Sequence, residues 1–232
     1  DTLVTQSDYD TLHDGMWLND NIISFALEYI DRTKCRGSSN GTQRITLLDP
    51  TVCQAVKLTG QAVELLAQRD LRASAGSSNT RGLLGVVSDS DSPDQPGGTH
   101  WSLLAIRYVA NCNATNGACR IVDALHFDSL SGNNRHSAAD LAAALHPALC
   151  DCPIALPTVR EAAGCARQAN SSDCGAFVLL YAEQLVDASS PDDWPLMSAG
   201  GDGRASEAVR ELRARYRRLI EQLAADRPVY KD

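Results

Sequence analysis

Apolar residues recur at helical spacing in several segments of the chain. After Trp17, the apolar side chains of WLNDNIISFALEYIDR fall on one face, and Asn19 or Asp20 can cap a helix there. Residues 173–186 are almost uniformly apolar over two turns, which is typical of a central buried helix, and residues 204–225 are amphipathic. Further patterns predict helices over 50–58 and 137–150, with another helical turn or two over 61–71.

Short apolar runs between these helices predict strands over residues 45–49, 83–89, 100–109, 120–130 and 154–161. The last is expected at a sheet edge, because Pro157 cannot donate to a ladder. Residues 73–82 and 90–98 have loop composition, and 110–119 read as a hairpin-like connection. There is no repeat and no clear linker. The order of helices, a mainly antiparallel group of strands, then helices predicts a single α+β domain spanning 1–232.

Composition narrows the functional classes. The chain has 232 residues, 44% hydrophobic and 22% charged, which is ordinary for a globular domain. A net charge of −8 argues against nucleic acid, and the basic stretch 210–218 alternates with apolar residues, so we expect a solvated helix face. No apolar run approaches the ~20 residues that cross a bilayer, and the first residues lack a secretory signal. We therefore expect no membrane partner and a cytoplasmic or nuclear address.

Eight cysteines raise the alternatives of disulfides or a metal. The chain is long for a disulfide-stapled scaffold, and Cys150 and Cys152 are too closely spaced for a usual zinc pair. Cys112 and Cys119 could join across a short loop, although a reduced pair is expected inside a cell. We expect no metal and no organic cofactor, and small core roles for most of the thiols.

Cys174 stands apart because it lies where a helix begins. A nucleophilic thiol needs the thiolate state, which a helix N-terminus and a neighbouring imidazolium both favour. The four residues before it, 170–173, are all capping types, and Gly175 would permit close approach of a substrate backbone. For the tripeptide D-C-G alone, a buried structural cysteine is the favoured interpretation.

A catalytic base and its carboxylate partner can be sought among the five histidines. His100 begins a strand directly after PGGT, whereas the others lie in polar turns, inside a helix or within a strand: His13, His136, His146 and His126. Asp128 closes the neighbouring strand and could orient the His100 ring; Asp123 is the rival, five residues earlier. Gln168 is a candidate oxyanion donor, because its loop must approach Cys174.

Four sequence blocks together resemble the ubiquitin-like-protein-specific (sentrin-specific) cysteine protease family, most closely its deneddylase branch. They are WLNDNIISFALEYI at 17–30, GGTHWSLLAIRY at 97–108, HFDSL at 126–130 and QANSSDCGAFVLLYAE at 168–183. The resemblance implies a papain-like cysteine protease fold, in which a small, mainly antiparallel sheet is flanked by helices and the nucleophile lies at the N-terminus of a central helix.

The resemblance also implies roles for individual residues. Cys174 would be the nucleophile, His100 the general base and acid, Asp128 the orienting carboxylate and Gln168 the oxyanion donor. Trp17 and Trp101 would cover a narrow channel for the Gly-Gly tail of a modifier, although Trp17 could instead be a hydrophobic staple. Asp20 would contact the modifier unless capping is its whole purpose, and Gly98 belongs to a loop that would close over the modifier.

The implied activity is thiol-dependent cleavage, by a monomer, after the C-terminal Gly-Gly of a ubiquitin-like modifier. The Nedd-type modifier, its precursor and its cullin conjugates are the expected substrates. Two departures from the family pattern bear on this expectation: the insertion around 109–119 and Ser172, which replaces an aromatic residue. Alternatives are a SUMO- or ubiquitin-directed protease with the same triad, an acetyltransferase with a similar His-acid-Cys framework, and an inactive modifier-binding module.

Overall fold

The computed structural model describes residues 2–35, 45–69, 71, 80–92, 98–110, 119–150, 157–188, 190–196 and 202–226. Its helices are α1 (Gln6–Asp10), α2 (Asp20–Ile30), α3 (Pro50–Thr59), α4 (Ala62–Leu65), α5 (Arg135–Leu149), α6 (Cys174–Asp187) and α7 (Asp202–Ala225). Two short turns of other helix types accompany them, η1 (Asp31–Cys35) and η2 (Pro191–Leu196). The strands are β1 (Ile45–Leu48), β2 (Thr80–Ser88), β3 (Trp101–Ala110), β4 (Cys119–Phe127) and β5 (Arg160–Glu161).

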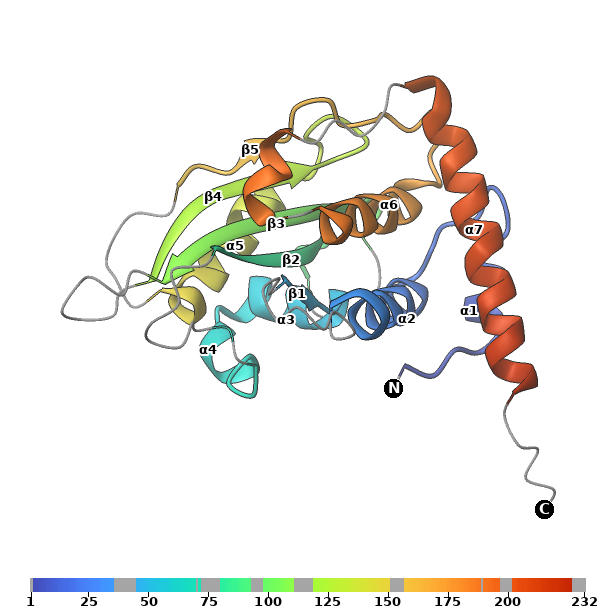
Figure 1. The fold of residues 1–232 in the computed structure, drawn as a ribbon, viewed down its shortest axis with the longest axis horizontal. Coiled ribbons are helices and arrows are strands. Elements are labelled where there is room, and N and C mark those ends of the chain that lie inside the picture. Colours follow the sequence, from blue (N-terminus) through green and yellow to red (C-terminus); the bar gives the residue numbers. More distant parts are fainter. Residues whose placement is uncertain are drawn as a thin grey trace, which may run out of the picture.

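The described strands form one sheet in the order β1-β2-β3-β4-β5. The two central pairings, β2 with β3 and β3 with β4, are antiparallel, whereas β1 and β5 pair parallel at the edges. The α+β prediction of a small sheet flanked by helices is confirmed. In Figure 1, α6 lies across one face of the sheet, α5 lies behind it, and α7 runs as a long helix along one side of the molecule.

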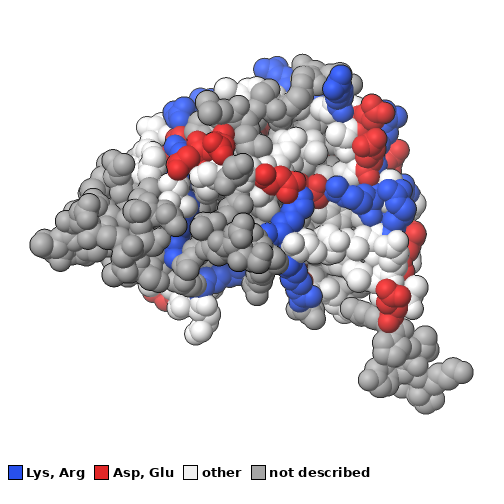
Figure 2. All heavy atoms as spheres, in the orientation of Figure 1, with Lys and Arg blue, Asp and Glu red and all other residues white. Residues whose placement is uncertain are grey.

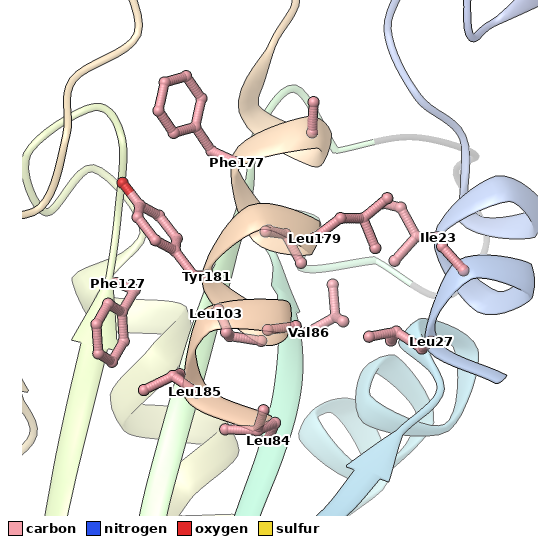
Figure 3. Packing of buried hydrophobic residues seen from close by; sticks show 14 of the residues in the cluster. Ile23, Leu27, Leu84, Val86, Leu103, Phe127, Phe177, Leu179, Tyr181 and Leu185 are labelled. Carbon is pink, nitrogen blue, oxygen red and sulfur yellow. The ribbon is translucent and has the colours of Figure 1, made fainter. Parts of the chain in front are cut away.

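Each face of the sheet buries its own hydrophobic cluster. One cluster packs α2, α6 and α7 against alternate strand residues such as Leu84, Val86, Leu103 and Phe127. Figure 3 shows Leu179 of α6 pointing toward Ile23 of α2, whereas Tyr181 of α6 lies beside Phe127 of β4. The second cluster packs α3, α4 and α5 against the intervening residues of the same strands, including Leu104. Because successive side chains point to opposite faces, a strand covered on both faces is apolar throughout.

Several predicted boundaries need correction. Strand β2 spans 80–88 rather than 83–89, so residues 80–82 are not part of the loop predicted over 73–82; their backbone pairs with residues 107–109 of β3. Helix α5 begins at Arg135, two residues before the predicted Ser137, and it includes His136 in its first turn. Within the described part, 157–161, of the outer strand predicted over 154–161, Arg160 and Glu161 alone are strand, at the predicted edge. Residues 72–79, 111–118 and 151–156 lie outside the described part of the chain.

The basic stretch 210–218 is not simply a solvated face. Arg210 and Arg218 are exposed on α7, but Arg213 is 1% exposed and packs inward. Figure 2 shows both basic and acidic side chains over the region of α7, rather than one basic patch. The sequence pattern missed Arg213 because charge at helical spacing does not reveal which charges find buried partners.

That residues 1–232 form a single domain stays a prediction. It is consistent with the two hydrophobic clusters, which pack on opposite faces of the same sheet. Among the described helices, none is long and apolar enough to cross a membrane.

Leu103 is fully buried in the α6 cluster and supplies a test of this packing. Leu103→Ala should lower the free energy of unfolding by about 3 kcal/mol, because it leaves a cavity against α6. Urea or thermal unfolding measures the change. Leu3→Ala is the control, since Leu3 is 69% exposed and its loss should cost little. Equal effects of the two substitutions would contradict this account of the core.

Candidate active site

The register of β3 against β4 places His100 beside Asp128. Leu103 pairs with Phe127, so Asp128 lies just beyond the end of β4 and His100 just before the start of β3. His100 Nε2 lies 2.6 Å from Asp128 Oδ1, and both side chains are almost completely buried. The pairing irregularity between β3 and β4 falls at Arg107/Tyr108, farther along the hairpin. The insertion around 109–119 therefore leaves the register at the His100 end intact.

Three donors surround the Asp128 carboxylate. Besides His100, the backbone N–H groups of Leu130 and Asn134 donate to it at 2.8 and 3.1 Å. Burial opposes the charged carboxylate, but the hydrogen bonds from His100, Asn134 and Leu130 outweigh it and lower the pKa of Asp128 to about 2. Asp128 is therefore a carboxylate throughout the physiological range.

The His100 ring interacts with Asp128 on one side and Cys174 on the other. Burial alone would lower the pKa of His100, but hydrogen bonds to Asp128 and Cys174, and the charges of both partners, raise it to about 9. Among the described residues, Nδ1 makes no hydrogen bond of ordinary geometry, and the Cys174 thiol is the group that it interacts with. The ring is thus held as an imidazolium between a carboxylate and a thiol.

Cys174 is the first residue of α6 and is 2% exposed. The capping residues predicted before it do not cap the helix: Asp173 occupies the N-cap position, but its side chain makes no capping hydrogen bond. Asn170 instead accepts from the N–H groups of Ser172 and Asp173, both at 3.1 Å, and closes the turn that precedes the helix. The amides of the first turn of α6 are therefore left without a side-chain partner beside the thiol.

Gln168 is fixed between the Asp128 segment and the turn before Cys174. Its Oε1 accepts from the Ser129 hydroxyl at 2.6 Å, and its Nε2 donates to the Asn170 carbonyl at 2.7 Å. One Nε2 hydrogen is thus used within the protein, which leaves the second available to a substrate oxygen.

The four predicted substrate-contacting residues line one pocket. Trp17, Asp20, Gly98 and Trp101 are joined there by residues of α3 and of the segment after β2, around a volume of about 600 Å³. Trp17 is 47% exposed, so it is not a buried staple; Leu18 and Ile23 occupy the staple positions and lie in the core. Asn19 caps α2, because its Oδ1 accepts from the Ile22 N–H at 3.1 Å. Asp20 is therefore exposed at the pocket rather than used as the cap.

Two glycines near the site are required by close packing. A Cβ at Gly175 would meet Leu18 Cβ at 2.9 Å, so the glycine allows α6 to approach α2 rather than opening the site to a substrate backbone, as the sequence had indicated. A Cβ at Gly98 would overlap the side chains of Ser88 and Asp89. This close approach lets Asp89 accept from the His100 N–H at 3.1 Å and so fix the start of β3.

The alternatives to the triad members have other partners. Asp123 accepts from Arg160 at 2.7 Å and lies 3.4 Å from Arg107, so two guanidinium groups surround it. His126 is completely buried, with Nε2 2.8 Å from the Ser102 hydroxyl and Nδ1 3.0 Å from Glu161. Within the described residues, no group of three or more His, Cys, Asp or Glu side chains could hold a metal ion.

Comparison with known proteins identifies the family. Residues 94–199 match the Ulp1 protease family, C-terminal catalytic domain. Human sentrin-specific protease 8 is 33% identical over 188 residues, which cover 80% of this chain and 78% of that protein. The chain belongs to the Ulp1 protease family. An Arabidopsis thaliana relative, NEDD8-specific protease 1, is 25% identical over 236 residues and covers 97% of this chain and 92% of its own length.

The fold agrees with this membership in the Ulp1 family. A crystal structure of a de-sumoylating protease superimposes with a TM-score of 0.60 at 18% identity, covering 96% of this chain and 88% of that chain. A Ulp1 protease domain solved in complex with Smt3, the yeast orthologue of SUMO, superimposes with a TM-score of 0.57. The chain is thus a cysteine protease with the Ulp1 fold, as the four sequence blocks implied.

Asn134 is a site residue of this Ulp1-family protease that the sequence did not single out. Its backbone N–H binds Asp128, and its side-chain amide donates to the His100 carbonyl at 3.1 Å and to the Ser102 hydroxyl at 3.1 Å. It therefore joins the two strand ends that carry the triad. The local sequence offered only one indication of this role: Asn134 lies six residues after Asp128 in a polar Asn-Asn pair. Such a pair is also ordinary turn composition, so it did not distinguish Asn134 as a site residue.

The raised pKa of His100 gives a direct test of the site. In the wild-type protein the His100 ring should lose its proton near pH 9. Asp128→Asn should lower this midpoint towards or below the ordinary histidine pKa of about 6.5, because the burial that lowers the pKa is then no longer opposed by the Asp128 charge. Histidine-selective NMR titration measures it. Asp123→Asn, in β4 just before Asp128, is the control and should leave the midpoint unchanged. An unshifted midpoint in Asp128→Asn would contradict the pairing.

Proposed function

We propose that Cys174, His100 and Asp128 form the catalytic triad of this protease, and that it cleaves after the C-terminal Gly-Gly of a Nedd-type modifier. The carrying observation is the buried arrangement in which the imidazolium of His100 lies between the Asp128 carboxylate and the Cys174 thiol. A thiol at a helix N-terminus beside an imidazolium is suited to nucleophilic attack. The intact set of residues favours an active enzyme over a module that only binds modifier.

The proposed reaction proceeds through a thioester. Cys174 reacts as the thiolate of a pair with the His100 imidazolium: its sulfur attacks the carbonyl carbon of the terminal glycine, and the negative charge passes to the carbonyl oxygen. When the C–N bond breaks, His100 gives its proton to the leaving amine. Water then attacks the thioester, and His100 takes up one of its protons. The C–S bond breaks to release the Cys174 thiolate and the modifier carboxylic acid, which loses its proton to solvent and becomes the carboxylate.

The oxyanion formed in this reaction needs donors close to Cys174. The amides in the first turn of α6 have no side-chain cap, and they lie at the positive end of the helix dipole. We propose that they share this role with the second Nε2 hydrogen of Gln168, which is held by Ser129 and Asn170.

The pocket lined by Trp17, Trp101, Asp20 and Gly98 is the proposed binding site for the modifier tail. Only glycine is thin enough to pass between closely placed indole rings, which would explain cleavage after Gly-Gly. The Nedd-type assignment is supported by the relative named NEDD8-specific protease 1, which matches nearly the full chain. Cullin conjugates and the modifier precursor are the proposed substrates.

A cytoplasmic or nuclear address and a monomeric state stay predictions. The described thiols Cys53, Cys165 and Cys174 form no disulfide, which is consistent with a reducing compartment. Size-exclusion chromatography with light scattering would measure the oligomeric state.

Removal of the nucleophile should abolish turnover. Cys174→Ala should reduce cleavage of a Nedd-type modifier with a C-terminal fluorogenic amide by at least about 10⁴-fold, because no thioester can form. Binding of the mature modifier, measured by calorimetry, should persist because the tail pocket is unchanged. Cys35→Ala removes a different cysteine, in η1, and should keep full activity. Normal cleavage by Cys174→Ala would show that the nucleophile is assigned wrongly.

Modifier choice can be tested with electrophilic probes. Three probes are compared, each with a C-terminal vinyl sulfone: the Nedd-type modifier, SUMO and ubiquitin. The Nedd-type probe should label Cys174 fastest, because labelling requires the modifier tail to fit the pocket and the rest of the modifier to fit the protease surface. Mass spectrometry of the intact protein measures the adduct. Faster labelling by SUMO or ubiquitin would overturn the Nedd assignment but retain the protease. Acetyl transfer from acetyl-CoA with no labelling at all would favour the acetyltransferase alternative.

A further inference from the structure

Arg213 is a buried cation whose partners converge on the segment that carries the nucleophile. It comes from α7, about 40 residues after Cys174 in sequence, and its side chain is 1% exposed. Its two terminal nitrogens donate to one carboxylate and four backbone carbonyls, at distances of 2.9 to 3.3 Å. These partners are Asp173 Oδ1 and the carbonyl oxygens of Thr11, His13, Met16 and Ser172.

The contact with Asp173 changes what that residue does. An aspartate at an N-cap position normally accepts from the amides of the first helical turn. Here one carboxylate oxygen accepts from Arg213 at 2.9 Å, and the other accepts from the Asn170 amide at 2.8 Å. Both oxygens are engaged away from the helix, and the first turn of α6 has no side-chain cap. Within the described part of the chain, the amides at its N-terminus thus have no side-chain cap beside Cys174.

We propose that Arg213 is a positioning residue of the active site. By binding the Asp173 carboxylate and the Ser172 carbonyl, it keeps the N-terminal amides of α6 free for the oxyanion that forms when Cys174 attacks. This inference rests on the proposed function, because it requires Cys174 to be the nucleophile. It makes α7, which lies outside the tail pocket, part of the catalytic architecture.

Electrostatics give the direction of the effect. Without Arg213, the Asp173 carboxylate would lose its cation and be free to cap α6, occupying an amide that the oxyanion needs. Its negative charge would also lie next to the negative oxygen of the intermediate, and both effects raise the energy of the transition state more than that of bound substrate. The loss should therefore fall mainly on kcat.

The first measurement compares two arginines of the same helix. Arg213→Met should lower kcat for the fluorogenic modifier substrate by about 10- to 100-fold, as expected for loss of oxyanion donors, with a smaller change in KM. Arg210→Met is the matched control, because Arg210 is exposed on α7 and, among the described residues, its side chain hydrogen-bonds just to the Ser206 carbonyl, at 3.4 Å. It should leave both constants unchanged. A KM increase without a kcat loss for Arg213→Met would overturn the proposal.

The decisive measurement is the combination with Asp173→Ala. Alanine can neither cap the helix nor place a charge beside the oxyanion, so the double variant Arg213→Met/Asp173→Ala should have a higher kcat than Arg213→Met alone. If Arg213 only held the structure together, removing a second partner would leave kcat equal or lower. Either of those results would overturn the proposal.

Loss of a buried cation leaves several carbonyl groups without donors, so Arg213→Met is paired with Arg213→Lys. Lysine keeps the charge with fewer donors, and its kcat should lie between wild type and Arg213→Met, again rising when Asp173→Ala is added. Circular dichroism and thermal scans confirm that each variant is folded. Inactivity of the wild-type protein would contradict the proposed function itself, whereas an active wild type without recovery in either double variant would contradict only the role of Arg213.

Discussion

The active site depends on one antiparallel register, that of β3 against β4. Because Leu103 lies opposite Phe127, His100 and Asp128 emerge from neighbouring strand ends on the same side and meet at 2.6 Å. A shift of one residue would turn one of the two side chains to the other face of the sheet. The two hydrophobic clusters prevent such a shift, since both faces of these strands are buried. Packing far from the site therefore determines the geometry of the proposed triad.

Charges buried beside the triad are tolerated because each has several hydrogen-bond partners. Asp128 is held by two backbone amides and an imidazolium, and Asp89 fixes the backbone of His100 from the other side. Asn134 connects the same two strand ends through its backbone and its side chain. These contacts orient the ring before substrate arrives, so little reorganisation is needed during the reaction.

Local sequence patterns predicted the elements well and the connections between them poorly. Helical and strand periodicity located α2, α6 and β1 to within about a residue, and the resemblance carried Cys174, His100 and Asp128 to positions that the structure brings together. The sequence did not predict three contacts of the site: the buried position of Arg213, the hydrogen bond from the His100 N–H to Asp89, and the bridge that Asn134 forms between the two strand ends. Each depends on partners distant in sequence, and a polar residue carries no local signal of where its hydrogen bonds will go. Asp173 shows the same limit: its capping type was evident, but its use elsewhere was not.

The uncapped start of α6 is where stability and activity compete. Capping by Asp173 would stabilise the helix by about 1 kcal/mol, yet it would fill the amides next to the thiol. The protein instead uses Asn170 to close the preceding turn and an arginine from the last helix to hold the carboxylate. Helix α7 thereby gives the Asp173 carboxylate a hydrogen-bond partner, although that carboxylate does not cap α6. Because an oxyanion requires donors that are already oriented and unoccupied, the structure keeps those donors unpaired at the position where negative charge would develop.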